Sequence, residues 1–272
     1  MSLRINLNAA ALNAHRQLQA TDSALGASIE RLTSGYRINR AADDPAGLAI
    51  SENLRAQISG LSQAISNSSD AVNMIRTAEG ALSEVQNLLR TMRNLALHAA
   101  NTGTNDSTAL DADQTQVQAA LASLDRIASN TQFGTKKLLD GSATGLTFQV
   151  GANANQTTQI SISSVASSAL GIATIDVTSD AQRAISALDT AISTVSTLRA
   201  ELGAAQKDLE SNIASLGVAK ENIAASESSV RDADMAAEMV EFTRNQILLQ
   251  AGVAMLTQAN TAPTALLSLL RG

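Results

Sequence analysis

Apolar residues recur at helical spacing through most of the chain, in the segments 3–33, 47–100, 108–128, 185–230 and 236–270. The most regular segment, 185–230, carries one apolar column that repeats every seven residues without exception. This column is Leu188, Val195, Leu202, Leu209, Leu216, Ile223 and Val230. A seven-residue period held over seven repeats is typical of a left-handed supercoiled helix seam and not of a globular helix.

One region has a different period. Leu146, Phe148 and Val150 alternate with polar residues, as do Ile160 and Ile162. This alternation predicts a β-hairpin near 146–165 and is the only strand signal in the pattern. The Ser/Ala/Thr-rich residues 163–180 are expected to form a connection.

Two short charged stretches, 34–51 and 228–235, interrupt the helical pattern. In the first, Gly35 can end a helix, Asp43 or Asp44 can cap the next one, and Pro45 suits its first turn. Both stretches therefore predict joints between helices. The charged residues expected at them are Arg37, Arg40, Asp43, Asp44, Arg231, Asp232 and Asp234.

The joint carboxylates allow two interpretations. They could hold a metal ion, but no third ligand occurs at suitable spacing, which favours helix capping and pairing with the arginines. We hypothesise that Arg37 and Arg40 of the first joint face Asp232 and Asp234 of the second.

Length matching predicts the architecture. The helix at 185–230 can lie along the pair 47–100 and 108–128, with the hairpin at the far tip of the bundle. The predicted fold class is mainly α: an elongated helical bundle or coiled coil with one small β-hairpin region, plus a paired terminal-helix domain. The expected boundaries are 1–45 with 232–272 for the inner domain and 46–231 for the outer rod.

The terminal helices carry more apolar surface than one antiparallel pair can hide. We therefore expect them to pack against other subunits, and we expect Pro263 to kink or restart the last helix. The candidate assembly residues are Leu18, Leu25, Ile29, Leu32, Met239, Phe242, Leu249, Val253, Leu256, Leu267 and Leu270.

Composition and charge exclude several classes of function. The net charge of −6 provides no basic field for nucleic acid. The absence of cysteine excludes disulfides, and no apolar run is long enough to span a bilayer. His15 and His98 lie among polar neighbours, which favours surface histidines. Because no catalytic or phosphate-binding motif is present, we expect no enzyme, no metal site, no cofactor, and neither nucleic acid nor membrane as a partner.

Several motifs resemble bacterial flagellin, the subunit of the flagellar filament. They occur in colinear order over essentially the whole chain. They are LTSGYRINRAADDPAGLAI at 32–50, QAISNSSD at 63–70, AEGAL at 78–82, NTQFG at 130–134, KLLDG at 137–141, FQVGA at 148–152, SVRDADMAAEM at 229–239 and the ending from QAN at 258–260 to Leu270.

The resemblance implies a structural subunit that polymerises with itself into a hollow helical tube used for swimming motility. It also implies an export chaperone, secretion through the flagellar type III apparatus, addition beneath a filament cap, and location in the extracellular filament. Related flagellins often insert a variable outer domain after the hairpin. Here only about 20 residues separate Val165 from the long C-terminal helix, so the chain resembles a short form.

The resemblance also bears on innate immunity. Flagellins recognised by Toll-like receptor 5 carry an arginine, a leucine and a glutamate on their first outer-core helices. The equivalent positions here are Thr91, Leu95 and Gln116, so both charges are missing. We expect weak or no receptor signalling.

Two other non-enzymatic functions remain open from the sequence. One is the flagellin-like hook-filament junction protein, whose relatives usually match less well through the middle of the chain. The other is an unrelated coiled-coil adaptor, which would keep ordered ends as a monomer.

Overall fold

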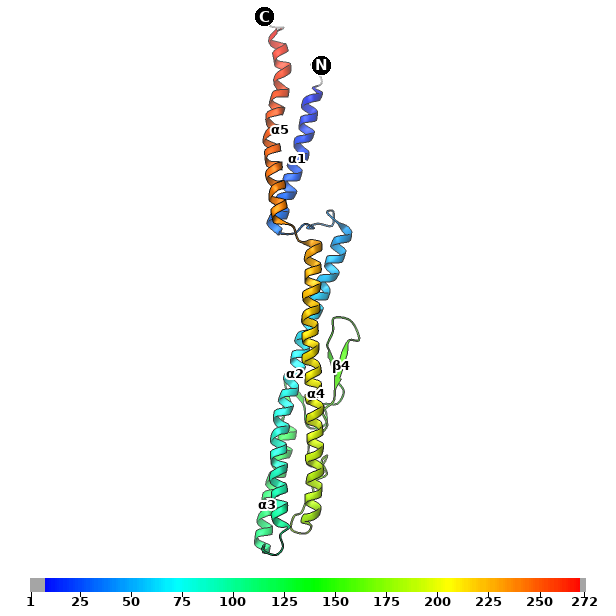
Figure 1. The fold of residues 1–272 in the computed structure, drawn as a ribbon, viewed down its shortest axis with the longest axis vertical. Helices are drawn as coiled ribbons and strands as arrows, with labels where there is room; N and C mark the ends of the chain where they lie inside the picture. Colours follow the sequence, from blue (N-terminus) through cyan, green and yellow to red (C-terminus); the bar gives the residue numbers. More distant parts are fainter. Residues whose placement is uncertain (1–7, 270–272) are drawn as a thin grey trace. The chain divides into compact units, whose positions relative to one another are not determined.

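A computed structural model describes the backbone of residues 8–269 and the side chains of residues 8–261. The described chain forms five helices and two small antiparallel strand pairs (Figure 1). The elements are α1 (Ala9–Ser34), α2 (Pro45–Ala99), α3 (Ser107–Asn130), β1 (Gln132–Phe133), β2 (Lys136–Lys137), β3 (Leu146–Gln149), β4 (Thr157–Ile160), α4 (Ala181–Arg231) and α5 (Met235–Leu269). The predicted mainly α fold with a small hairpin region is confirmed.

The chain divides into two compact units. Residues 1–56 and 222–272 make up one unit, called here the terminal unit, and residues 57–221 make up the other, called the central unit. The terminal unit contains α1, α5, the first turns of α2 and the last turns of α4.

The central unit has a continuous apolar core between α2, α3 and α4. Ile75, Leu82 and Leu89 of α2 are fully buried, together with Leu124 of α3. The first four residues of the α4 column that repeats every seven residues, Leu188, Val195, Leu202 and Leu209, are buried in this core. The other three, Leu216, Ile223 and Val230, are half-buried. The periodicity thus identified the core face of α4.

Three ion pairs join α2 and α4 alongside this core. Arg93 pairs with Asp189 at 2.5 Å, Arg199 with Glu79 at 3.4 Å, and Arg76 with Glu210 at 3.4 Å. Glu210 also accepts from Lys207 and Gln206, and these hydrogen bonds lower the pKa of its carboxyl to about 2. Such pairs at the edge of a helix seam favour one helix register and orientation.

The predicted hairpin is present as β3 and β4, with Leu146 opposite Ile160 and Gln149 opposite Thr157. It does not lie at the far tip of the bundle. Asn67 of α2 donates to the Gln149 carbonyl at 3.1 Å, and Ala152 in the hairpin loop approaches Gly60 of α2. The physical reason is that Leu138, Leu139 and Ala143 are buried, so the segment after α3 returns along the core before β3 begins.

A second strand pair precedes this hairpin and was not predicted. β1 and β2 pair Gln132 with Lys137 and Phe133 with Lys136 around a turn at Gly134, which has φ +59°. Strands of two residues are too short to show a hydrophobic period, so no alternation pattern could reveal them.

The connection after the hairpin is an ordered part of the core. Val165, Ile172 and Val177 are buried in it. Gln114 of α3 donates to the Ile175 carbonyl at 3.1 Å and accepts from the Val177 amide at 2.9 Å. Asp125, also on α3, accepts from the Ser167 amide and hydroxyl, both at 2.8 Å. These two side chains fix a segment that has little regular structure of its own.

Candidate functional site

The candidate site is the terminal unit, where α1 and α5 run antiparallel. Asn8, at the start of α1, donates to the Ala259 carbonyl near the end of α5 at 2.9 Å. Arg31, near the end of α1, lies 3.7 Å from Glu238 at the start of α5. Between these levels Gly252 lies against Leu18, where an added Cβ would come within 2.8 Å of the leucine Cδ1.

The seam between the two helices is narrow. On α1 its half-buried leucines are Leu18, Leu25 and Leu32, and on α5 its large apolar residues are Phe242, Leu249 and Leu256. The other positions of the seam are small or polar: Ala14, Thr21 and Ser28 on α1, and Asn245, Gly252 and Ala259 on α5. Each helix therefore hides only one stripe.

The remaining candidate assembly residues lie outside this seam where the structure describes them. Ile29 is 46% exposed, Met239 is 50% exposed and Val253 is 52% exposed. The side chains of Leu267 and Leu270 lie outside the described residues. The candidate assembly residues predicted from the sequence therefore include two different sets. One set joins α1 to α5, and the other points away from the helix pair.

The outward surface of α5 is apolar on several sides. Up to Thr261, its exposed large apolar side chains are Met235, Met239, Val240, Ile247, Leu248, Val253 and Met255. Four of them, together with Thr243 and Arg244, line one shallow open depression, namely Met239, Val240, Ile247 and Leu248. A helix that is apolar all round is ordinarily a buried helix.

Burial differs sharply between the two units. Among the described side chains, Ile38 is the only large apolar residue of the terminal unit that is buried, whereas the central unit contains an extended buried core. Of the fourteen large hydrophobic residues that are exposed among residues 8–261, eleven lie in the terminal unit: Leu12, Ile29, Tyr36, Ile50 and the seven residues of α5 named above. The terminal unit has little apolar core of its own to stabilise it.

The two joints of the terminal unit pair with each other through their backbones. Gly35 ends α1 with φ +76°, a conformation that favours glycine, and its amide donates to the Arg31 carbonyl at 2.8 Å. The Ala233 amide donates to the Gly35 carbonyl at 2.9 Å, and the Arg37 amide donates to the Arg231 carbonyl at 2.7 Å. These bonds form an antiparallel bridge between Tyr36 and Asp232.

Arg231 organises the side chains of this bridge. Its guanidinium donates to Glu52 at 2.6 Å and lies 4.9 Å from the centroid of the Tyr36 ring. The hydrogen bond from Arg231 lowers the pKa of the Glu52 carboxyl. Arg231 is itself buried. An arginine is rarely buried unless it is paired, and here Glu52 is the partner.

The prediction that Arg37 and Arg40 face Asp232 and Asp234 is wrong, because all four side chains have other partners. Arg37 donates to the Val230 carbonyl, and Arg40 pairs with Glu30 at 2.8 Å. Asp232 accepts from the Ser228 hydroxyl at 2.5 Å, and Asp234 accepts from the Ala236 amide at 2.9 Å.

The physical reason is local. Three of the joint carboxylates, those of Asp43, Asp44 and Asp234, lie beside backbone amides at helix starts and turns that lack a helical partner, and they accept hydrogen bonds from these amides. Asp44 caps α2 by accepting from the Gly47 amide at 2.9 Å. Asp43 accepts from the amides of Arg40 and Asn39, and these two bonds lower the pKa of its carboxyl.

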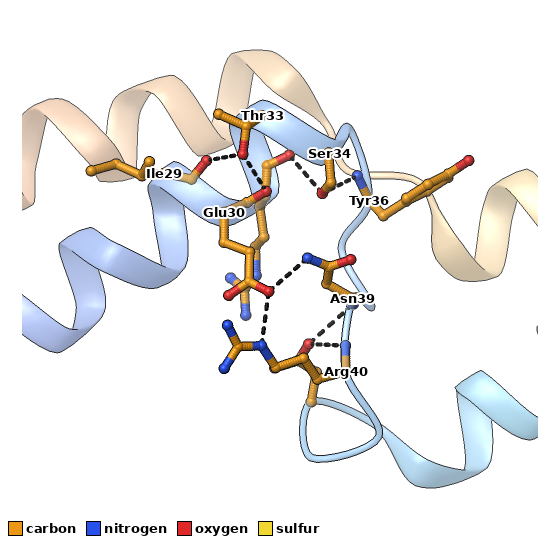
Figure 2. A network of polar contacts seen from close by, with 9 residues as sticks. Ile29, Glu30, Thr33, Ser34, Tyr36, Asn39 and Arg40 are labelled. Atoms are coloured by element: carbon orange, nitrogen blue, oxygen red, sulfur yellow. Dashed lines mark hydrogen bonds and ion pairs between the residues drawn. The ribbon is translucent and has the colours of Figure 1, made fainter.

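Two acidic residues of the joint were not found from the sequence. Figure 2 shows Glu30 of α1 turned toward Asn39 and Arg40. The Glu30 carboxylate accepts from the Asn39 side-chain amide at 2.6 Å and from the Arg40 guanidinium at 2.8 Å. Glu52 accepts from Arg231 across 179 residues of sequence. Both glutamates lie inside helical segments, where a charged residue ordinarily indicates only a solvent-facing side.

The other residues singled out from the sequence lie in the central unit, apart from His15. Thr91 on α2 and Gln116 on α3 are exposed, and Leu95 is half-buried against the core. His98 contacts Asp113 at 2.6 Å between α2 and α3, whereas His15 is exposed on α1 in the terminal unit.

The described part of the chain offers no metal-binding group and no membrane span. It contains no cluster of three or more histidine or acidic side chains that could hold a metal ion. It also contains no helix that is long and apolar enough to cross a membrane.

The chain matches two family models. Residues 5–144 match the bacterial flagellin N-terminal helical region, and residues 185–270 match the bacterial flagellin C-terminal helical region.

Individual proteins agree with these matches. The chain is 44% identical to the flagellin of Bacillus subtilis, covering 99% of this chain and 100% of that protein. It is 47% identical to the flagellin of Halalkalibacterium halodurans, covering 98% of this chain and 99% of that protein. Its fold is similar to the crystal structure of Bacillus cereus flagellin, with a TM-score of 0.51 at 28% identity, over 56% of this chain and 88% of that one.

Proposed function

Because this chain belongs to the bacterial flagellin family, we propose that its paired terminal helices drive assembly by burying their outward apolar surface against other copies of the chain. The chain is a structural subunit of the flagellar filament and not an enzyme. The observation that carries the proposal is the contrast in burial. Eleven exposed large apolar residues lie in a unit whose described side chains include a single buried one, Ile38.

The proposed contact surface has two parts. The seam residues Leu18, Leu25, Leu32, Phe242, Leu249 and Leu256 hold α1 to α5 within one subunit. The outward residues Ile29, Met239 and Val253, with the rest of the exposed α5 surface, contact neighbouring subunits. Leu267 and Leu270 are proposed for the same surface from the sequence alone. Burying one such side chain contributes about 1.5 to 3 kcal/mol, so several together can stabilise a polymer.

The polymer that we propose is a hollow helical tube used for swimming motility. In it, residues 1–45 and 232–272 form the inner domain and residues 46–231 form the outer rod. The joint residues Arg37, Arg40, Asp43, Asp44, Arg231, Asp232 and Asp234 orient the helices that meet between these domains. The backbone bridge at Tyr36 and Asp232 supports this role because it ties both joints together.

Export and location belong to the same proposal. We propose that the chain leaves the cell through the flagellar type III apparatus after binding an export chaperone, and joins the extracellular filament beneath a cap protein. The large uncovered apolar surface of α5 supports the need for a chaperone, because exposed surface of this kind promotes aggregation.

Weak recognition by Toll-like receptor 5 is also proposed. Thr91 and Gln116 are exposed, yet neither carries the charge expected at its position. Hydrogen bonds to charged groups contribute about 1.5 to 3 kcal/mol each, so their absence weakens binding. A reporter-cell dose response equal to that of a typical enteric flagellin would contradict this part of the proposal.

The hook-filament junction protein is not favoured. The two relatives named above are flagellins matched over 98% or more of this chain, including the middle.

Seeded elongation tests the proposal. Heat-dissociated subunits are added to short filament seeds and elongation is followed by electron microscopy. The full chain should elongate seeds, and a variant truncated after Ser228, which lacks α5, should not. Failure of the full chain to elongate competent seeds would contradict the proposal.

A matched pair of substitutions localises the effect to the outward surface. Ile247→Ser removes a 60% exposed apolar side chain from α5 and should raise the critical concentration at least tenfold. Gln250→Ser shortens an exposed polar side chain on the same helix and should change the critical concentration by less than twofold. If the two substitutions change the critical concentration equally, burial of the apolar Ile247 side chain does not drive assembly.

A further inference from the structure

We propose that Asn8 and Pro263 act as a pair that sets the axial register of α1 against α5. The inference rests on the proposed function, because the register decides which outward residues of the two helices face neighbouring subunits together. Asn8 is therefore assigned as a positioning residue for assembly, not as a contact residue between subunits.

Pro263 creates a free acceptor inside α5. The helix extends from Met235 to Leu269 and so continues through Pro263; of the two expected effects of this proline, a kink or a restart, the restart does not occur. A proline has no amide hydrogen, so the carbonyl four residues earlier receives no intrahelical hydrogen bond. That carbonyl belongs to Ala259, which is half-buried.

Asn8 covers this acceptor and begins α1 with the same side chain. Its amide nitrogen donates to the Ala259 carbonyl at 2.9 Å, while its amide oxygen accepts from the Ala11 backbone at 3.1 Å as the helix cap. A half-buried carbonyl without a donor is costly, so the bond matters more than an ordinary surface contact. The start of α1 is thereby tied to one level of α5.

The seam alone does not determine this level. Its large residues repeat every seven positions on both helices, as Leu18, Leu25 and Leu32 on α1 and Phe242, Leu249 and Leu256 on α5. Leu18 lies against Gly252, and a slip of seven residues, about 10 Å, would bring Asn245 or Ala259 to the same level, which are also seam positions without a large apolar side chain. A single polar pair in an apolar seam is a known way to exclude such alternatives.

The other polar contact of the seam is a weaker constraint. Arg31 and Glu238 are 3.7 Å apart, and the arginine side chain is 37% exposed. The Glu238 side chain is only 13% exposed, but 3.7 Å is longer than a hydrogen bond, and two long side chains at this separation tolerate shifts along the seam. Asn8 is short, so its two hydrogen bonds restrict it to one geometry.

A double-mutant cycle on the full-length chain tests the pairing. The measured quantity is the critical concentration for elongation of wild-type seeds. Asn8→Ser keeps a good helix cap but removes the donor, and it should raise the critical concentration about fivefold. Pro263→Ala gives the Ala259 carbonyl an intrahelical donor, so Asn8→Ser in that background should change the critical concentration by less than twofold.

Each outcome separates this inference from the proposed function. If the wild-type chain does not elongate seeds, the proposed function fails first. If the wild type elongates but Asn8→Ser has no effect, or the same effect in both backgrounds, only the pairing is overturned. If Asn8→Ser abolishes elongation, recovery in the Pro263→Ala background supports the pairing and no recovery overturns it. Pro263→Ala alone should elongate, and loss of elongation in this variant would contradict the pairing.

Discussion

The guanidinium of Arg231 lies 4.9 Å from the centroid of the Tyr36 ring while it donates to Glu52 at 2.6 Å. Tyr36 follows α1, Arg231 ends α4 and Glu52 lies in the first turns of α2. One side chain therefore links three helices of the terminal unit. An arginine suits this role because it can stack on a ring and donate from its edge at the same time.

Arg231→Lys should weaken the joint although it keeps the charge. A lysine cannot stack its head group on Tyr36 and reach Glu52 in the same fork geometry. The lost stacking costs about 0.5 to 1 kcal/mol, and the filament should dissociate at a lower temperature on calorimetric heating. Arg55→Lys is the control, because Arg55 pairs with the same Glu52 but is 53% exposed. Equal shifts for the two variants would disprove the role of Arg231.

The joint should loosen in acid. The pKa of Glu52 is lowered by its bond from Arg231, and the pKa of Asp43 by bonds from the Arg40 and Asn39 amides. A carboxyl with a lowered pKa contributes stability that is fully present above its ordinary pKa, 4.5 for Glu52 and 3.8 for Asp43, and is lost as pH falls through the lowered value.

Dissociation temperatures measured from pH 7 to pH 3 check this prediction. Glu52→Gln should lower the dissociation temperature at pH 7, and its difference from the wild type should shrink as the pH approaches 3. A difference that stays constant over this range would mean that the charge of Glu52 does not stabilise the joint.

The connection after the hairpin should depend on Gln114. Gln114→Ala leaves the Ile175 carbonyl and the Val177 amide without their partners, at a cost of about 1 to 3 kcal/mol for each buried group. The monomer should unfold at lower urea, and the Val177 amide should exchange its hydrogen faster. Gln118→Ala on the exposed side of the same helix is the control. If the two variants unfold at the same urea concentration and exchange the Val177 amide at the same rate, Gln114 does not hold this segment in place.

The helices could be predicted because their signals are local and repeated. The column Leu188, Val195, Leu202 and Leu209 predicted the core face of α4, and Gly35 and Pro45 predicted a helix end and a helix start. The strand pair at Gln132–Phe133 could not be predicted because it is too short to show a period.

The joint contacts could be predicted only in part. That charged residues gather there follows from the sequence, but Glu30 and Glu52 are brought in by helices whose approach is a tertiary property. The contact of Asn8 with Ala259 spans 251 residues, and an isolated proline in a helical pattern gives no indication of its partner.

The outward surface of α5 should be free in the monomer and covered in the filament. The methionines of the chain are natural probes of it. Met235, Met239 and Met255 are exposed on α5, whereas Met74 and Met92 are buried in the central unit. Because exposed thioethers oxidise readily to sulfoxides, hydrogen peroxide followed by mass spectrometry measures each site without any substitution.

The most direct measurement is the rate of methionine oxidation in monomers and in filaments. In the monomer, Met235, Met239 and Met255 should oxidise rapidly while Met74 and Met92 remain protected. In the filament, the three α5 methionines should become protected as well, with oxidation rates at least tenfold lower than in the monomer. Oxidation of all three at the same rate in both states would contradict this prediction, because the apolar surface of α5 would then remain uncovered after assembly.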